Sequence, residues 1–279
     1  MTVGEALAHG TNVLAEAGID TARLEAELLL AKACDDCARA LLYMELRREL
    51  TVEAEAAYEE LLTRRAQREP LAYILGHWGF RRLTLKTDKR ALIPRPETEI
   101  VVERALRHLL GMEEPAVLDV GTGTGAIALA IADEHPQARV TAIDASEDAL
   151  ALARENFDLL DLDGRVRLVE HDLTEGLGRD EFDLVVSNPP YIEPEDLETL
   201  QPEVRDWEPR IALVAHGATE AVARAATEAL RPGGWIVLEI AENQAASVAD
   251  LLRDLGYQRL TVSPDMAGRD RVIEAEWSR

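Results

Sequence analysis

Residues 117–125 read Val-Leu-Asp-Val-Gly-Thr-Gly-Thr-Gly, an apolar strand that runs into a glycine-rich turn and then into a helical pattern. Glycine lets a backbone turn sharply and approach a ligand closely. In open parallel sheets, ligands bind beside such a turn, at the carboxyl ends of the strands. Asp144 ends the next expected strand, 21 residues after Gly123, and a carboxylate there can accept both hydroxyls of an adenosine ribose. The stretch therefore predicts an α/β domain that binds a nucleoside-containing ligand.

The spacing of the glycines indicates which ligand this is. The pattern is Gly-x-Gly-x-Gly, whereas a dinucleotide-binding loop carries Gly-x-Gly-x-x-Gly. Asp119 stands just before the loop, where an acidic group repels a pyrophosphate but suits the ammonium group of a methionine. We therefore favour S-adenosylmethionine, with S-adenosylhomocysteine as its product, over a dinucleotide and over a turn without function. Asp172 and Leu173 follow the third strand and are placed to meet the adenine. The residues expected to bind the cofactor are Asp119, Gly121, Thr122, Gly123, Thr124, Gly125, Asp144, Asp172, Leu173 and Asn188.

From Glu97 onward, apolar strands alternate with helical segments. Strands are expected at residues 116–120, 140–144, 166–170, 184–187, 235–240, 259–263 and 271–276, and helices at about 97–110, 125–134, 146–158, 218–230 and 243–255. Such alternation predicts a Rossmann-like sheet of seven mostly parallel strands with helices on both faces. Only a short link through Gly268 joins the last two strands, so we expect them to pair antiparallel.

The fourth strand ends in Asn188-Pro189-Pro190-Tyr191, which suits transfer of a methyl group to nitrogen. A planar nitrogen conjugated to a carbonyl or a ring gains positive charge as it attacks, so preorganised hydrogen-bond acceptors aimed at its N–H bonds help. The side-chain oxygen of Asn188 and the backbone carbonyl of Pro189 are such acceptors, and proline adds no competing N–H. The ring of Tyr191 can lie against the flat acceptor group and favour its charge. We expect Asn188, Pro189 and Tyr191 to be catalytic, and the whole run, with Pro190, to bind the acceptor amide or amine.

The chain divides into three parts. Residues 1–70 show helical periodicity almost throughout and predict a small all-α domain, whose second helix is capped by Asp20. Residues 71–95 predict a β-hairpin linker, and residues 96–279 the S-adenosylmethionine-dependent methyltransferase domain. Every chemical motif lies after residue 90, so we expect the helical domain to recruit a protein substrate.

The amino-acid composition limits the classes of partner that the protein can bind. Thirty basic and fifty-three acidic residues give a formal charge of −23, which argues against a large duplex-binding surface, because such binding draws its affinity from Lys and Arg on phosphates. The sequence has no run of about 18 apolar residues and no signal-peptide pattern at its start. We therefore expect a cytoplasmic protein that does not bind a membrane.

Cys34 and Cys37 form a Cys-Asp-Asp-Cys motif. A structural zinc site needs four ligands, and no second pair of cysteines or nearby histidines supplies the other two. A thioredoxin-like pair would follow a strand, whereas this pair ends a helical stretch. We expect two helix-end thiols and no metal site.

Motifs along nearly the whole chain resemble the PrmC/HemK-type family, the peptide chain release factor glutamine N5-methyltransferases. The resemblance rests on residues 17–20, 25–30, 73–76, 92–99, 121–125, 188–191 and 207–210, with Asp144. It implies methylation of the side-chain amide nitrogen (N5) of the glutamine in the Gly-Gly-Gln motif of class 1 peptide chain release factors. Two places depart from the family pattern: residues 214–217 replace an Asp-Gly-Gly-like run, and Ala241 stands where glycine is common.

Other functions stay open at this point. A nucleic-acid N-methyltransferase acting on an exocyclic amine shares the Asn-Pro-Pro-Tyr chemistry, but the charge of −23 and the lack of a basic recognition domain oppose direct nucleic-acid binding. A ribosomal-protein glutamine methyltransferase is harder to exclude, although residues 93–97, Ile-Pro-Arg-Pro-Glu, favour release factors. A non-catalytic binding module would not need an intact acceptor motif.

Overall fold

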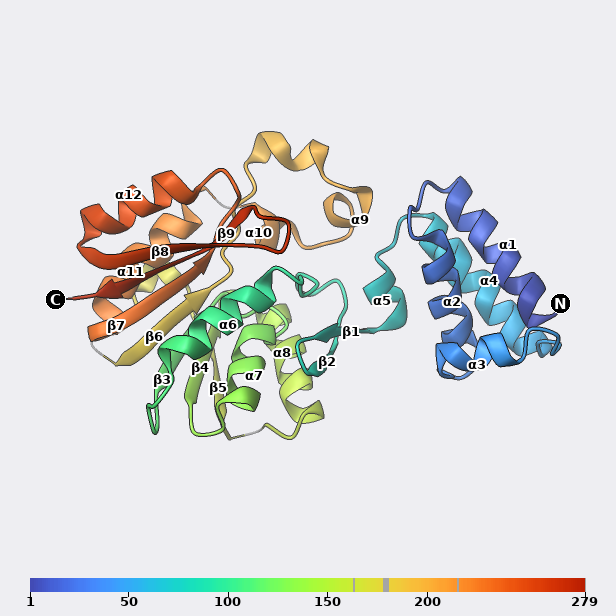
Figure 1. The fold of residues 1–279 in the computed structure, drawn as a ribbon, viewed down its shortest axis with the longest axis horizontal. Helices are drawn as coiled ribbons and strands as arrows, with labels where there is room; N and C mark the ends of the chain where they lie inside the picture. Colours follow the sequence, from blue (N-terminus) through green and yellow to red (C-terminus); the bar gives the residue numbers. More distant parts are fainter. Residues whose placement is uncertain (163, 178–180, 215, 279) are drawn as a thin grey trace. The chain divides into compact units, whose positions relative to one another are not determined.

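The structure is a computed structural model that describes residues 1–162, 164–177, 181–214 and 216–278. The chain forms two units (Figure 1). The helical unit consists of Met1–Gly76 and Gln201–Trp207, and the α/β unit of His77–Leu200 and Glu208–Arg279. No helix in the described part of the chain is both long and apolar enough to cross a membrane.

The helical unit contains α1 (Val3–Glu16), α2 (Ala22–Ala33), α3 (Arg39–Met44), α4 (Val52–Ala66) and α5 (Leu71–Leu75), joined by the distant α9 (Pro202–Arg205). Side chains cap two of these helices: Thr2 forms a capping box with Glu5 at α1, and Thr51 caps α4. The expected cap of α2 by Asp20 is wrong. The N-cap residue is Thr21, whose hydroxyl instead donates to the carboxylate of Glu25 at 2.7 Å.

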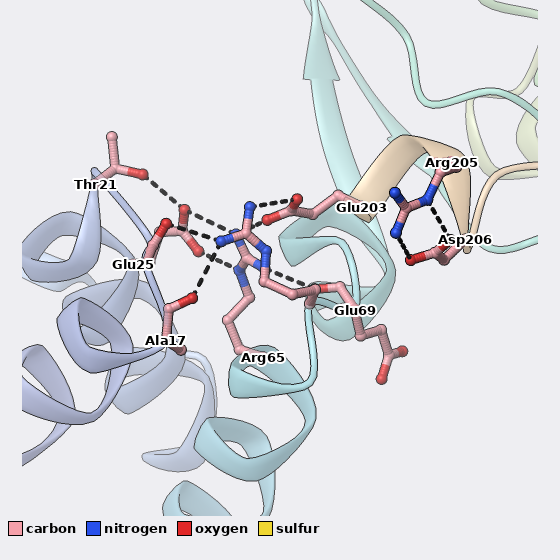
Figure 2. Close-up of polar contacts among 10 residues, drawn as sticks. Ala17, Thr21, Glu25, Arg65, Glu69, Glu203, Arg205 and Asp206 are labelled. Carbon is pink, nitrogen blue, oxygen red and sulfur yellow. Dashed lines mark hydrogen bonds and ion pairs between the residues drawn. The ribbon is translucent and has the colours of Figure 1, made fainter. Parts of the chain in front are cut away.

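A buried ion-pair cluster connects α4 to α9 within the helical unit (Figure 2). The Arg65 guanidinium is almost fully buried and donates to the carboxylates of Glu25 and Glu203, the latter at 2.8 Å. Arg68 adds a second bond to Glu203 at 2.7 Å. Buried charges are tolerated only when they are paired and hydrogen-bonded, and the two glutamates provide this for Arg65.

The α/β unit begins with an antiparallel hairpin, β1 (His77–Phe80) and β2 (Leu83–Lys86). Its main sheet has seven strands in the order β5-β4-β3-β6-β7-β9-β8. The first five are parallel, and β9 pairs antiparallel with both β7 and β8, which confirms the prediction for the last two strands. The strands are β3 (Ala116–Val120), β4 (Arg139–Asp144), β5 (Val166–Glu170), β6 (Phe182–Ser187), β7 (Leu230–Glu239), β8 (Tyr257–Pro264) and β9 (Asp270–Trp277).

Two layers of helices bury opposite faces of the sheet (Figure 1). Successive side chains of a strand point to opposite faces, so in β3 Val117 packs in one apolar layer and Leu118 in the other. The first layer holds α6 (Thr98–His108), α7 (Ala126–Glu134) and α8 (Glu147–Leu159), and the second holds α11 (Ala218–Ala229) and α12 (Ala245–Leu255). The short elements η1 (Leu173–Glu175), η2 (Pro194–Thr199) and α10 (Arg210–Leu213) lie in the connections.

The strand order brings three segments to one edge of the sheet. β3 lies between β4 and β6, and its last residue, Val120, is in register with Ile143 of β4 and Ser187 of β6. Three features therefore lie side by side at this edge: the glycine loop after β3 (residues 121–125), Asp144 at the end of β4, and the acceptor loop after β6 (residues 188–191).

Candidate active site

The glycine loop turns the chain from β3 into α7. Its three glycines have φ angles between +56° and +83°, a region that residues with a Cβ rarely adopt. The backbone N–H groups of Gly121 and Thr122 both donate to the carbonyl of Ile143, which ties the loop to the end of β4. Gly125 also allows close packing, because a Cβ there would lie 2.7 Å from a ring carbon of Phe157.

Asp119 does not occupy its expected place. Its carboxyl group is fully buried and does not contribute to the wall of the cofactor pocket. One oxygen accepts the Thr122 hydroxyl at 2.7 Å and the Ala128 N–H at 3.2 Å, and the other has no partner among the described residues. Burial raises the pKa of Asp119 to about 7. Because the side chain holds the loop and the first turn of α7 from beneath, we propose that it shapes the loop and does not touch an ammonium group directly.

Asp144 lies in the pocket wall at the end of β4. Its two oxygens accept the backbone N–H groups of Gly123 and Ser146, each at 2.9 Å. Each carboxylate oxygen has two lone pairs, so both can still accept a ribose hydroxyl. Burial raises the pKa of this carboxyl group, and the backbone hydrogen bonds oppose that rise. These hydrogen bonds hold the carboxylate at the end of β4, the position that the sequence pattern predicted for it.

The pocket between these segments has a volume of about 500 Å³, within the usual range of about 300–1,000 Å³ for small-molecule sites. Of the residues expected to bind the cofactor, Asp119 and Gly125 lie outside its lining. Those in the lining are Gly121, Thr122, Gly123, Thr124, Asp144, Asp172, Leu173 and Asn188. The size of the pocket, its largely apolar wall and the oxygen pair of Asp144 fit an adenosyl group.

The acceptor loop faces two hollows. Asn188, Pro189 and Pro190 line the cofactor pocket, whereas Tyr191 lines a smaller neighbouring hollow that it shares with Pro190. Burial and the nearby carboxylate of Glu239 raise the pKa of the Tyr191 hydroxyl above its ordinary value. Both residues that were expected to supply an acceptor oxygen, Asn188 and Pro189, therefore line the cofactor pocket. The hydroxyl of Tyr191 is bonded to Glu239, and the contact of its ring with the acceptor amide stays a prediction.

Hydrogen bonds from α6 and β7 support the acceptor loop from behind. The Asn188 side-chain nitrogen donates to the Thr98 hydroxyl oxygen at 3.2 Å, and that hydroxyl donates to the Glu239 carboxylate at 2.6 Å. The other oxygen of Glu239 accepts the Tyr191 hydroxyl at 2.9 Å. Sequence reasoning did not assign a role to Thr98 or Glu239. Thr98 belongs to residues 92–99, which carried the family resemblance, and that was the available signal.

The linker before α6 also forms part of the pocket. Residues 89–95 line it, and the buried carboxylate of Glu208 holds them by accepting the backbone N–H of Ile93 at 3.1 Å and the guanidinium of Arg95. Burial raises the pKa of Glu208, and Arg95 opposes that rise. Two stretches that carried the family resemblance, at 92–99 and 207–210, therefore meet at one wall of the site.

The departures from the family pattern lie near the second hollow. Of residues 214–217, Ala215 lies outside the described residues, and Gly217, with φ +69°, directly precedes α11. Cys34 and Cys37 are free thiols of intermediate exposure. Among the described residues, no group of three or more His, Cys, Asp or Glu side chains is placed to hold a metal ion.

Comparisons with known proteins assign the chain to the methyltransferases. An S-adenosylmethionine-dependent O-methyltransferase from Thermotoga maritima has a similar fold, with a TM-score of 0.51 and 18% identity over 68% of each chain. The model of the methyltransferase small domain matches residues 99–203, and that of the PrmC N-terminal domain matches residues 5–76.

Similar sequences identify the family. The release factor glutamine methyltransferase of Caulobacter vibrioides is 40% identical over 98% of this chain and 96% of its own length. The release factor glutamine methyltransferase of Deinococcus radiodurans is 43% identical over 99% of this chain and 98% of its own length. The chain belongs to the release factor glutamine methyltransferase family.

Proposed function

We propose that this protein uses S-adenosylmethionine, in the cytoplasm, to methylate the side-chain amide nitrogen of the Gly-Gly-Gln glutamine in class 1 release factors. The observation that carries the proposal is the shared wall of the pocket. The two hydrogen-bond acceptors of the acceptor loop, at Asn188 and Pro189, line the same cavity as the glycine loop and Asp144. Donor and acceptor sites are adjacent because β3 pairs with both β4 and β6.

Each group of residues around the pocket has its own role in the proposed reaction. When bound, the cofactor supplies an electrophilic methyl group. Asp144 accepts the ribose hydroxyls, and Asp172 and Leu173 border the adenine. Asn188 Oδ1 and the Pro189 carbonyl accept the two N–H bonds of the glutamine amide and orient its nitrogen towards the methyl group.

The acceptor groups act mainly in the transition state. The amide nitrogen becomes pyramidal and positive as it attacks, so its N–H bonds become stronger donors to Asn188 and Pro189. Proline has no N–H at Pro190 that could compete for these oxygens. The carbon–nitrogen bond replaces the carbon–sulfur bond of the methyl group, which leaves S-adenosylhomocysteine as the other product. The surplus proton then passes from the nitrogen to water, so the site needs no general base before attack.

The helical unit is proposed to recruit the release factor. It supplies none of the residues that line the cofactor pocket, yet the similarity to release factor glutamine methyltransferases extends over 98% of the chain. A domain that takes no part in the chemistry can still set the affinity for a large substrate.

The decisive test incubates the full-length protein with cofactor carrying a labelled methyl group. The substrates are a class 1 release factor, the same factor with Gln→Ala in its Gly-Gly-Gln motif, ribosomal proteins, and ribosomal RNA. We expect label in the unaltered release factor alone, located on the glutamine by mass spectrometry. Label in RNA would support the exocyclic-amine alternative, label in a ribosomal protein would support the other glutamine substrate, and either result without release factor methylation would refute the proposal.

A further inference from the structure

A buried carboxylate, Glu239, stands behind the acceptor loop without taking part in the chemistry described above. It is the last residue of β7 and is 1% exposed. Its two oxygens accept hydrogen bonds from different elements: the Thr98 hydroxyl, at the start of α6, and the Tyr191 hydroxyl, at the end of the acceptor loop. An ionised carboxylate in a protein interior costs several kcal/mol, so its place beside a reactive loop calls for an explanation.

The direction of each hydrogen bond follows from the chemistry of the groups. Burial raises the pKa of Glu239, and the hydrogen bonds from Thr98 and Tyr191 together with the charge of Arg271 oppose that rise. We take Glu239 in its ionised form, which only accepts hydrogen bonds, whereas a hydroxyl has one proton to donate. The proton of Thr98 is therefore committed to Glu239, at 2.6 Å. The Thr98 oxygen can then only accept a hydrogen bond from Asn188, its other neighbour. Asn188 therefore turns its N–H₂ group towards Thr98, at 3.2 Å.

The orientation of Asn188 decides whether the site works. The two ends of a side-chain amide have nearly the same shape and opposite polarity. With N–H₂ turned to Thr98, Oδ1 is left to accept an N–H of the substrate amide. If the Thr98 proton were free, it could donate to Oδ1, and the amide could then present N–H₂ to the substrate, where it would repel the developing positive charge.

We propose that Glu239 is a positioning residue, which fixes the amide orientation of Asn188 through Thr98 and anchors the far end of the same loop through Tyr191. One carboxylate thereby sets the polarity at one end of the acceptor loop and the position of its other end. The inference rests on the proposed role of Asn188 as an acceptor for the glutamine amide.

The test is a double-mutant cycle on turnover. Thr98→Val keeps the shape of the side chain and removes both of its hydrogen bonds. We expect kcat for the release factor to fall about 10- to 10²-fold, less than the about 10²–10³-fold expected for loss of a preorganised group that contacts the substrate. Cofactor affinity should stay unchanged, and Thr98→Ser should recover most of the rate.

The cycle separates positioning from general destabilisation. If Thr98 acts through Asn188, Thr98→Val should cost less than about 2-fold in the Asn188→Ala background, because coupled residues are not additive. An equal cost in both backgrounds would overturn the proposal. Glu239→Gln tests the same positioning role from the carboxylate side. The N–H₂ group of glutamine must donate to the hydroxyl of either Thr98 or Tyr191, and we expect kcat to fall at least 10-fold. Wild-type turnover with Glu239→Gln would also overturn the proposal.

A spectroscopic readout distinguishes failure of this inference from failure of the proposed function. In protein labelled with ¹⁵N at asparagine, the side-chain N–H₂ signals of Asn188 are identified by their loss in Asn188→Ala. We expect them to shift in Thr98→Val and Glu239→Gln but not in Thr227→Val, a matched control whose hydroxyl bonds to a helix carbonyl away from the pocket. Unmoved signals would refute the positioning role whatever the substrate proves to be. Shifted signals without release factor methylation would refute the proposed function alone.

Discussion

Asn188→Ala tests the placement of the acceptor site most directly. The asparagine has two roles: its Nδ2 donates to Thr98 at 3.2 Å, and its Oδ1 is proposed to accept an N–H of the substrate in the pocket that the residue lines. Alanine removes both. Because Thr98 also lines the pocket, water can replace the lost donor, so we expect the cost in stability to be about 1 kcal/mol. The cost in turnover should be about 10²–10³-fold, or roughly 2.7–4 kcal/mol.

Asn188→Asp separates the acceptor function from the polarity of the loop. Aspartate keeps an oxygen for the substrate and adds a negative charge, which taken alone would favour the transition state. The structure predicts a penalty, because the second oxygen would face the Thr98 oxygen, whose proton is bound to Glu239. One unmade buried hydrogen bond costs about 1–3 kcal/mol, or about 5–150-fold. We therefore expect Asn188→Asp to lie between the wild type and Asn188→Ala.

The assay is single-turnover methylation of a release factor containing Gly-Gly-Gln, with cofactor affinity measured by calorimetry. Both variants should bind the cofactor about as tightly as the wild type, since the contact matters mainly in the transition state. An unimpaired Asn188→Ala enzyme would mean that the acceptor site is elsewhere. An Asn188→Asp enzyme faster than the wild type would mean that charge, and not hydrogen-bond direction, dominates.

Three further results are expected. Asp144→Ala should weaken cofactor binding by roughly 1.5–3 kcal/mol, measured by calorimetry with the exposed Asp158→Ala as control, and unchanged affinity would exclude the ribose contact. The pKa of Asp119 is raised from 3.8 to about 7 in the folded protein, so the folded state binds this proton more tightly than the unfolded state. The free energy of unfolding should therefore fall as the pH rises from 3.8 to about 7, by at most about 4 kcal/mol. Denaturant unfolding at several pH values should show a smaller loss across that window for Asp119→Asn, and identical slopes would contradict the shift. A fragment of residues 77–279 should bind cofactor and methylate a Gly-Gly-Gln peptide but have a lower kcat/KM than the full chain on the intact release factor; equal kcat/KM would contradict recruitment by the helical unit.

The starting point of that fragment shows what the structure adds to the sequence. A linker interpretation of residues 71–95 suggests a cut near residue 90. Phe80, Leu83 and Leu85 of the hairpin, however, pack in the same apolar cluster as α6 and α7. A fragment that starts at residue 90 would remove these side chains from the core, so residue 77 is the better boundary.

Much of the site could be predicted because it depends on strand ends. Once alternation indicates a parallel sheet, the residues that follow neighbouring strands must meet at one edge, as Asp144 and the acceptor loop do. The approximate places of the strands and the antiparallel final pair follow from apolar runs and a short link. The start of β7 does not: it was expected at residue 235 but lies at Leu230, ahead of Pro232 and two glycines that interrupt the apolar pattern.

The remaining contacts depend on packing that no local pattern encodes. Glu239 contacts Thr98, 141 residues away in the sequence, because α6 packs against β7. A glutamate at the end of an apolar strand does not by itself indicate that contact. Asp119 was expected in the pocket from charge alone, but alternation along β3 and the turn of the glycine loop bury it beneath the loop instead. Likewise, nothing in the sequence of residues 201–207 indicates that they belong with the helical unit.

That last feature has a consequence for the order of events during biosynthesis. Arg65 and Glu203 are 138 residues apart, and at about 5–20 residues per second a ribosome needs about 7 to 28 s to add the stretch between them. For that time Arg65 has the Glu25 carboxylate and the Glu69 carbonyl as partners but not Glu203, and Arg68 also lacks its bond to Glu203. The helical unit is the first to be synthesised, but it can be completed only after β3 to β6 have been translated.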